Sequence, residues 1–328
     1  MLLEVKNLTT EFKLKRGIVK AVDDISFTID KGEILAIVGE SGSGKSVTSL
    51  SIMGLLQKPG RIAGGEILYN SQDLNKMSRK ELQRLRGNKI SMIFQEPMTS
   101  LNPVWRIKDQ IMESIMTHMG LSKKEALART IEMLNTVGIP SAAQRANDYP
   151  HQMSGGMRQR VMTAMALACE PELLIADEPT TALDVTIQAQ ILELLYRMRE
   201  KFHMAVLLIT HDLGVVSEAA DRVIVMYCGK IMEEADVKSL FSQPLHPYTV
   251  GLLQSIPQID NESDERLYMI KGMVPNPLNM PSGCPFSDRC DHSKERCTKE
   301  MPELHEINGH KVRCFLYDEA EERGLCGK

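Results

Sequence analysis

A basic charge excess and long hydrophobic runs are both missing from this 328-residue sequence. The formal net charge is −4, which does not favour nucleic acid as the main partner. Apolar runs stay shorter than the 18 residues of a membrane-spanning helix, and charges interrupt the N-terminal segment where a signal peptide would be apolar. We therefore expect the chain to remain on the cytoplasmic side of the membrane.

Cysteine is scarce until the last fifth of the chain. Cys169 and Cys228 lie in apolar segments and read as small core residues. The other five cysteines crowd the C-terminal end, and in a reducing compartment such clustering points to metal before disulfides. Hydrophobic residues make up 43% and charged residues 25%, which is typical of a globular protein rather than a disordered one.

The hydropathy pattern predicts an α/β domain with an appendage. Residues 34–46 read as a buried strand, a glycine-rich turn and a helix start. Further strands are expected at Ile90–Phe94, Leu173–Ala176, Ala205–Thr210 and Arg222–Tyr227. Their alternation with helical patterns predicts a largely parallel sheet covered by helices. We expect a domain over residues 1–256 and a loop-rich, proline-rich extension over 257–328.

A helical insertion is expected at about residues 96–165, where the strand pattern disappears. Ile107–His118 and Lys123–Val137 carry apolar residues at helical spacing. Trp105 and the methionines in this region either form an exposed docking face or belong to the helix core. These methionines are Met98, Met112 and Met116.

A phosphate-binding motif lies between the first strand and the first helix. Gly39–Ser46 reads GESGSGKS and fits GxxxxGK followed by Ser or Thr. In such a loop backbone N–H groups wrap the phosphates, Lys45 neutralises their oxygens and Ser46 ligates Mg²⁺. A plain flexible turn is the alternative, but the flanking strand and helix favour the motif. The candidate nucleotide-binding residues here are Gly39, Ser41, Gly42, Ser43, Gly44, Lys45, Ser46 and Thr48.

Two consecutive carboxylates end the predicted strand in Leu173–Pro179. Open α/β sheets bind ligands at the C-terminal ends of their strands. We therefore expect Asp177 to reach Mg²⁺ and Glu178 to polarise or orient the attacking water. Alone such a pair is more often a solvated turn, but after a phosphate-binding loop it supports nucleotide hydrolysis.

A second anion site is predicted at Ser154–Gln159, which reads SGGMRQ and opens a helix. A single chain would not need both this segment and the phosphate-binding loop to hold one nucleotide. Two chains arranged head to tail would need both, because each nucleotide would then contact the loop of one chain and this segment of the other. The segment resembles the LSGGQ signature of ABC ATPases, and the resemblance covers residues 1–255. Here Met153 replaces the usual leucine and Met157 the usual glutamine, while Ser154, Gly155 and Gly156 are intact.

The resemblance implies an ABC-type nucleotide-binding fold, with a RecA-like core, an antiparallel β subdomain and a helical subdomain. Gln95 matches the Q-loop glutamine that senses Mg²⁺ and water, and His211 matches the switch histidine that contacts the γ-phosphate. Thr181–Asp184 resembles the D-loop, which places Asp184 beside the nucleotide. Phe12 stands where the family has an aromatic that stacks on adenine; the alternative is a strand core residue.

The sequence also resembles one branch of the family, the peptide-importer ATPases. The resemblance is carried by PMTSLNPV at 97–104, HPYT at 246–249 and the segment GCPFSDRC at 283–290. It implies a motor for dipeptide or oligopeptide uptake, although nickel or glutathione could be the solute instead. It also implies a second, homologous ATPase, two membrane-spanning permeases and, indirectly, a substrate-binding protein as partners, with peripheral attachment to the membrane.

Two classes of protein outside transport also use a phosphate-binding loop. A soluble ABC protein acting on ribosomes or DNA usually fuses two cassettes or inserts a long coiled coil, and the sequence has neither feature. A P-loop kinase with a small phosphate acceptor is disfavoured by the Ser-Gly-Gly signature and by His211. The transport ATPase is therefore the preferred interpretation.

Four cysteines in the extension form a candidate metal site: Cys284, Cys290, Cys297 and Cys314. Four thiolates suit either tetrahedral Zn²⁺ or a 4Fe–4S cluster, and their spacing leaves the choice open. The resemblance to peptide-importer ATPases implies the cluster. His292, His305 and His310 are candidate substitutes, and Cys326 lies outside the pattern.

Overall fold

The structure is a computed structural model that describes residues 1–95, 100–180, 185–256, 268–307 and 309–318. It divides into two compact units. The first comprises residues 1–3, 28–34 and 69–209, and the second comprises residues 4–27, 35–68 and 210–328. The boundary expected between residues 256 and 257 stays a prediction.

Parallel, buried strands form the sheet portion of the first unit. They are β6 (Ile90–Ile93), β7 (Leu173–Asp177) and β8 (Ala205–Ile209), in the order β8-β7-β6. Every residue of β7 and β8 is buried, as expected for parallel strands covered on both faces. The strands predicted at these three positions are confirmed. The short β5 (Gln72–Asp73) also belongs to this unit.

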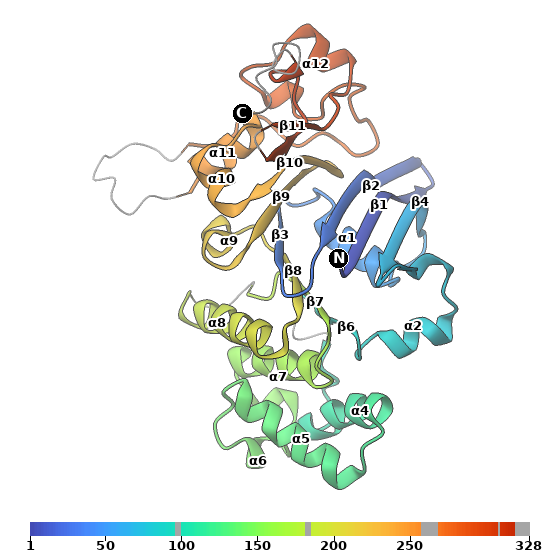
Figure 1. Ribbon diagram of the computed structural model, residues 1–328, viewed down its shortest axis with the longest axis vertical. Coiled ribbons are helices and arrows are strands. Elements are labelled where there is room, and N and C mark those ends of the chain that lie inside the picture. The colour runs from blue at the N-terminus through green and yellow to red at the C-terminus, as the bar shows by residue number, and fades with distance from the viewer. Residues whose placement is uncertain (96–99, 181–184, 257–267, 308, 319–328) are drawn as a thin grey trace, which may run out of the picture. The chain divides into compact units, whose positions relative to one another are not determined.

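Helices make up most of the rest of the first unit. They are α2 (Arg79–Leu85), α4 (Ile107–Met119), α5 (Lys123–Thr136), α6 (Ala142–Arg145), α7 (Gly155–Leu167) and α8 (Val185–Phe202), with 3₁₀ turns at Leu74–Lys76 and Pro150–Gln152. In Figure 1 α4, α5 and α6 lie together beside α7. A capping box between Ser122 and Glu125 fixes the start of α5. The helices predicted from Ile107 and from Lys123 are confirmed.

Two sheets contribute strands to the second unit. The long strands β1 (Leu3–Leu14), β2 (Gly17–Ile29) and β4 (Gly60–Tyr69) lie in one sheet, in the order β2-β1-β4. The other strands are β3 (Ile34–Val38), β9 (Arg222–Tyr227), β10 (Lys230–Asp236), β11 (His305–Ile307) and β12 (His310–Val312), in the order β11-β12-β10-β9-β3. β3 and β9 are parallel, and the strands at Ile34 and Arg222 are confirmed.

Short helices complete the second unit. They are α1 (Lys45–Ile52), α9 (Leu213–Ala219), α10 (Val237–Ser242), α11 (Pro247–Gln254) and α12 (Glu295–Lys299), with a 3₁₀ turn at Ser287–Arg289. Each of α9, α10 and α11 begins at a side-chain cap, supplied by Asp212, Asp236 and His246 in turn.

The C-terminal extension, expected only as loops, adds strands to the sheet of the second unit. Glu233 of β10 pairs with Val312 of β12, and β12 pairs with β11. The fully buried Glu233 carboxylate accepts hydrogen bonds from the N–H groups of Leu245 and His246, both at 2.9 Å, and lies 3.0 Å from His310 Nδ1. This buried polar group therefore joins the hairpin and the start of α11 to β10.

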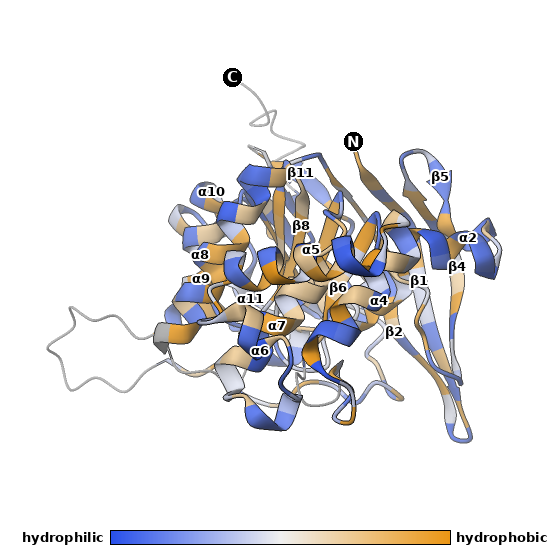
Figure 2. Cartoon of the chain, turned by 90° about the horizontal axis from the view of Figure 1, so that it is seen from below, coloured by the Kyte–Doolittle hydropathy of each residue, from blue (hydrophilic) through white to orange (hydrophobic). Residues whose placement is uncertain are grey.

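Hydropathy follows this layering of strands and helices. In Figure 2 the strands near β8 are mainly hydrophobic, whereas α2 is mainly hydrophilic. Among the described residues, none of the helices has both the length and the apolar character needed to span a bilayer.

Candidate functional site

The loop Gly39–Ser46 connects β3 to α1 and has the backbone of an anion-binding turn. Gly39, Gly42 and Gly44 have φ values of 147°, 79° and 103°, in the region that favours glycine. A Cβ on Gly39 would lie 2.1 Å from the Met226 carbonyl oxygen, and one on Gly44 would lie 2.3 Å from the Ala21 carbonyl oxygen. The glycines are therefore needed for both conformation and space, and the loop's N–H groups gather at the start of α1.

Lys45 is buried and folded back onto this loop. Its side chain donates to the carbonyl oxygens of Gly39 at 2.7 Å and Glu40 at 3.0 Å, and to Ser43 Oγ at 3.4 Å. Ser43 is buried, and its own carbonyl accepts from the N–H of Gly229 at 2.9 Å. An ammonium held against the backbone of a glycine-rich loop is suited to phosphate oxygens.

The remaining residues predicted in this loop differ in accessibility. Ser41 and Gly42 are exposed, and Ser46 is half-buried in the first turn of α1. Thr48 is fully buried, and its hydroxyl donates to the Gly44 carbonyl at 3.0 Å. Thr48 thus contacts the loop's backbone from inside the helix.

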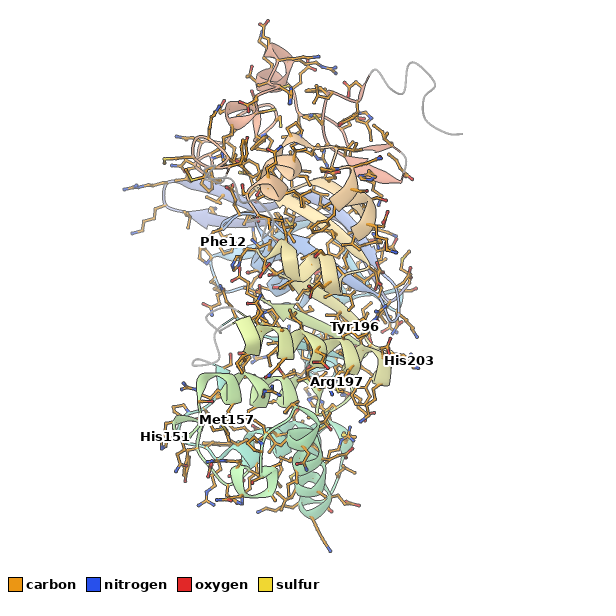
Figure 3. The ribbon with its side chains drawn as sticks, turned by 90° about the vertical axis from the view of Figure 1, so that its left-hand side faces the viewer. Phe12, His151, Met157, Tyr196, Arg197 and His203 are labelled. Atoms are coloured by element: carbon orange, nitrogen blue, oxygen red, sulfur yellow. The ribbon has the colours of Figure 1, made fainter. Side chains whose placement is uncertain are left out.

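Phe12 lies on β1, half-buried, and its ring packs against Gly60 at the start of β4 (Figure 3). A Cβ on Gly60 would come within 2.7 Å of Phe12 Cε1. The absence of a side chain at position 60 therefore leaves room for the ring.

The acidic pair ends β7 in the first unit. Asp177 is 4% exposed and faces Ile209 of β8 in the parallel register. Glu178 is half-buried, has a φ of 46° and donates its N–H to the Ile209 carbonyl at 2.8 Å. A non-glycine residue in this left-handed region carries backbone strain, which is characteristic of functional sites.

Gln95, predicted as a catalytic partner, contacts Glu178 directly. Its Nε2 donates to Glu178 Oε2 at 2.8 Å. The structure thus brings together two side chains that are 83 positions apart, at adjacent strand ends of the first unit.

The signature segment Ser154–Gly156 forms the N-terminus of α7 (Figure 3). Ser154 is the N-cap, and its hydroxyl accepts from the N–H of Met157 at 3.3 Å. Ser154 and Gly155 are exposed, whereas Gly156 packs against Ile187 closely enough that an added Cβ would lie 3.3 Å from it. An exposed N-terminus of a long helix presents N–H groups and a positive dipole end.

His211 follows β8 but belongs to the second unit. It is exposed, and its neighbours are fixed: the Thr210 N–H donates to the Ile37 carbonyl at 3.2 Å, and Asp212 caps α9. Position 211 therefore follows a backbone anchored to β3, the strand that leads into the phosphate loop. Asp184 and Met98 lie outside the described residues.

Three of the predicted docking residues are described. The exposed fractions of Trp105 and Met116 are 45% and 42%. Met112 on α4 is only 5% exposed and is therefore a core residue. A separate cavity of about 280 Å³ in the first unit is lined by Met92, Ile93, Phe94, Ser100, Met162 and Met165.

The four cysteines of the extension line one small apolar cavity, together with Pro247 and Phe286. They are Cys284, Cys290, Cys297 and Cys314, and none is in a disulfide. Within the described residues no group of three or more His, Cys, Asp or Glu stands close enough together to hold a metal ion. His292 also lines the cavity; His305 lies instead 3.1 Å from Asp318, and His310 pairs with Glu233.

Backbone donors face these sulfurs. Burial raises the pKa of Cys284 to about 12 and that of Cys314 to about 11. Hydrogen bonds from the backbone of Phe286, His292 and Leu316 act in the other direction, lowering the pKa of Cys284, Cys290 and Cys314. Such N–H groups stabilise thiolates, which are the form that binds metal.

Sequence reasoning missed the buried residues that hold these segments. Gln159 is 2% exposed and donates its side-chain amide to the carbonyl of Pro179, the residue after Glu178. Arg289 pairs with Glu40 inside the phosphate loop. Glutamine in an otherwise apolar helix face was a weak signal, and nothing in the spacing of Arg289 pointed to residue 40.

Comparison with known proteins identifies the family of the chain. The family model described as ABC transporter matches residues 22–181, and the one described as oligopeptide/dipeptide transporter, C-terminal region, matches residues 232–297. The oligopeptide transport ATP-binding protein AppD of Bacillus subtilis is 58% identical over 97% of both chains. The dipeptide transport ATP-binding protein DppD of Haemophilus influenzae is 52% identical over 95% of this chain and 94% of its own.

A solved structure that is similar to this chain belongs to the same family. The dimeric, post-hydrolysis ATP-binding cassette MJ0796, bound to ADP and Pi, is 30% identical with a TM-score of 0.66, over 72% of this chain and 99% of its own. The chain therefore belongs to the ATP-binding proteins of the ABC transporters, in the branch of the oligopeptide and dipeptide transport subunits. The predicted family and the predicted ABC cassette fold are confirmed.

Proposed function

We propose that this chain is the ATP-hydrolysing subunit of an importer for dipeptides or oligopeptides, attached to the cytoplasmic face of the membrane. The observation that carries the proposal is the loop Gly39–Ser46, in which three positive-φ glycines and the buried Lys45 form a phosphate-binding turn. Its relatives in Bacillus subtilis and Haemophilus influenzae are oligopeptide and dipeptide transport proteins, which supports peptides as the solute. Nickel or glutathione as the solute, or a soluble role outside transport, would compete with this assignment.

Each predicted residue has a proposed role in the reaction. In the second unit the loop binds the ATP phosphates, Phe12 stacks on adenine and His211 contacts the γ-phosphate. In the first unit Glu178 either accepts a proton from the attacking water or orients that water. The Gln95 amide holds the Glu178 carboxylate in place for this role. Mg²⁺, when bound, neutralises phosphate charge; Ser46, Asp177 and Gln95 are the side chains that would hold it.

A second cassette completes the mechanism. The exposed Ser154–Gly156 end of α7 would bind the nucleotide of the partner, and the partner's equivalent segment would bind the nucleotide of this chain. Asp184 is proposed beside the same nucleotide. Solved relatives of this fold include a dimeric cassette with ADP and Pi, which supports pairing. We propose a second homologous ATPase as the partner, with two permeases and, indirectly, a substrate-binding protein.

The permeases are proposed to dock on the first unit, near residues 95–105. Trp105 is exposed, and the cavity beside Ile93 and Phe94 is lined mainly by methionine and other apolar side chains. Methionine suits adaptable contacts with a partner segment. The start of this region is Gln95, so the Glu178 carboxylate and the docking face are joined by a short stretch of chain.

Peptide uptake tests the assigned solute. We expect cells that lack this subunit to lose uptake of a labelled dipeptide or oligopeptide and to regain it with the intact gene. Uptake of labelled nickel and of glutathione, measured in the same cells, is expected to be unchanged. Retained peptide uptake together with loss of nickel or glutathione uptake would assign the motor to that other solute.

We propose further that Cys284, Cys290, Cys297 and Cys314 bind a metal centre, a 4Fe–4S cluster in preference to Zn²⁺. Support comes from the shared apolar cavity and from backbone N–H groups directed at the sulfurs of all four cysteines. Hydrogen bonds to cysteine sulfurs are among the features that set the potentials of such clusters. The centre would hold together an extension with little apolar core of its own.

Metal analysis of anaerobically purified protein tests the cysteine site. We expect about four irons with matching sulfide and a broad visible absorbance, as for a 4Fe–4S cluster. Cys290→Ser should lose the absorbance, while Cys326→Ser, outside the four-cysteine group, should keep it. One zinc without colour would overturn the cluster, and protein without metal would overturn both assignments.

A further inference from the structure

Arg289 of the C-terminal extension forms an ion pair with Glu40, the second residue of the phosphate loop. Arg289 Nη1 lies 2.6 Å from Glu40 Oε2, and Nη2 lies 3.0 Å from Oε1. Two parallel N–H···O bonds fix both the distance and the orientation of the carboxylate. The two residues are 249 positions apart, and both belong to the second unit.

The Arg289 side chain is almost completely buried, at 4% exposure, while Glu40 is 30% exposed. Its Nη1 also donates to Tyr227 Oη at 3.1 Å, and its Nε donates to the Lys271 carbonyl at 3.0 Å. The hydrogen bond to Glu40 is the main cause that raises the pKa of Arg289 above its usual value. Because Arg289 is buried to this extent, its ion pair with Glu40 differs from the solvent-exposed ion pairs of protein surfaces, which contribute little to stability.

Glu40 is held at its backbone as well as at its side chain. Its N–H donates to Tyr248 Oη at 2.8 Å, and its carbonyl accepts from Lys45 Nζ at 3.0 Å. Tyr248 packs against Tyr227 and Phe286, with ring centroids 4.7 Å and 5.3 Å away. One residue of the loop therefore connects the phosphate-binding lysine to an aromatic and arginine cluster formed around the extension.

The motif does not require a charged residue at position 40, because this is one of its variable positions. The phosphate-binding motif therefore does not account for the charge on Glu40. The buried Arg289 guanidinium is the group with which this charge forms an ion pair. Arg289 in turn directly precedes Cys290, which lines the cysteine cavity, and ends the 3₁₀ turn that begins at Ser287. The position of the guanidinium is set by the cysteine-bearing loop of the extension.

We infer that Arg289 is a positioning residue for ATP binding: through Glu40 it holds the phosphate loop in its binding conformation. The inference rests on the proposed role of Gly39–Ser46 as the ATP site. Without the guanidinium, Glu40 is expected to move toward water, and the carbonyl that orients Lys45 moves with it. The extension is thereby part of the nucleotide site, although it supplies no side chain to the phosphates.

ATP affinity of the complete transporter tests this role. We expect Arg289→Met to raise the dissociation constant of a fluorescent ATP analogue and the KM for ATP about tenfold, the effect of losing one charge-assisted contact. The kcat at saturating ATP should change less than about twofold, because the reacting groups are untouched. Arg289→Lys, which keeps the charge but not the paired geometry, should fall in between.

A double-mutant cycle and a matched control sharpen the result. Glu40→Gln alone is expected to reproduce the loss of affinity, and Glu40→Gln combined with Arg289→Met should be no worse than either change alone. Arg296→Met removes another arginine of the extension, which is half-exposed and pairs with Glu300 and Asp318. It should leave the affinity for ATP unchanged.

Different outcomes separate this inference from the proposed function. If Arg289→Met and Glu40→Gln both bind ATP normally while Lys45→Ala does not, the ion pair only attaches the extension and the inference is wrong. If Lys45→Ala also binds ATP normally, the proposed ATP site itself is wrong. If Arg289→Met fails to fold, Glu40→Gln tests the same ion pair through its other residue. An unchanged affinity of Glu40→Gln for ATP would overturn the inference.

Discussion

Replacing Glu178 by glutamine is expected to slow steady-state ATP hydrolysis by the assembled transporter about 10²- to 10⁴-fold, the range for loss of a general base. The carboxylate is half-buried at the end of β7, and Gln95 orients it from 2.8 Å away. Glutamine keeps the size and the hydrogen-bonding reach but cannot accept the proton of the attacking water. ATP binding should survive, because the phosphate loop belongs to other residues.

The expected product of Glu178→Gln is a closed, ATP-bound pair of cassettes. It is detected by retention of labelled ATP on the purified complex and by its hydrodynamic size. Glu193→Gln makes the same chemical change at a site on α8 whose side chain is 69% exposed, and it should hydrolyse ATP as the unaltered protein does. Normal turnover in the Glu178 variant would remove this residue from the mechanism.

Lys45→Ala is expected to weaken ATP binding at least about tenfold and to lower hydrolysis by about 10²-fold or more. The ammonium is buried and held by the carbonyls of Gly39 and Glu40, so it needs little reorganisation to reach phosphate oxygens. The alanine variant lacks the positive charge that would stabilise the phosphates of bound ATP and of the transition state.

Titration with a fluorescent ATP analogue measures the loss in Lys45→Ala, and phosphate release measures the turnover. Lys31→Ala, at an exposed position between β2 and β3, is the matched control and should behave as the unaltered protein. Because Lys45 also bonds three groups of its own loop, the melting temperature should be recorded. A stable variant with full ATP affinity would contradict the assigned loop.

Local sequence was sufficient for the buried parallel strands and for the motifs they carry. The runs at Leu173 and Ala205 are apolar throughout, and the structure buries every residue in them, because parallel strands covered on both faces have no polar side. The turn Gly39–Ser46 was equally readable, since positive φ and close backbone approach leave glycine as the residue that fits. Ser122 and Ser154 are the N-caps of α5 and α7, and serine is among the residues favoured at that position.

Other features depend on residues far apart in the chain, and no local pattern encodes them. The pairing of Gln95 with Glu178, the packing of Phe12 on Gly60 and the left-handed backbone of Glu178 arise where strands meet. The hairpin of the extension pairs with β10, and its His310 lies 3.0 Å from the buried Glu233 carboxylate.

The contact between Arg289 and Glu40 is the clearest case. Each residue alone reads as an ordinary surface charge, and 249 positions separate them. Folding brings the pair together and removes Arg289 from water, and burial turns two ordinary charges into a specific, oriented bond. Spacing and motifs therefore predicted the segments that we assign to the nucleotide, whereas the three-dimensional packing set what holds those segments in place.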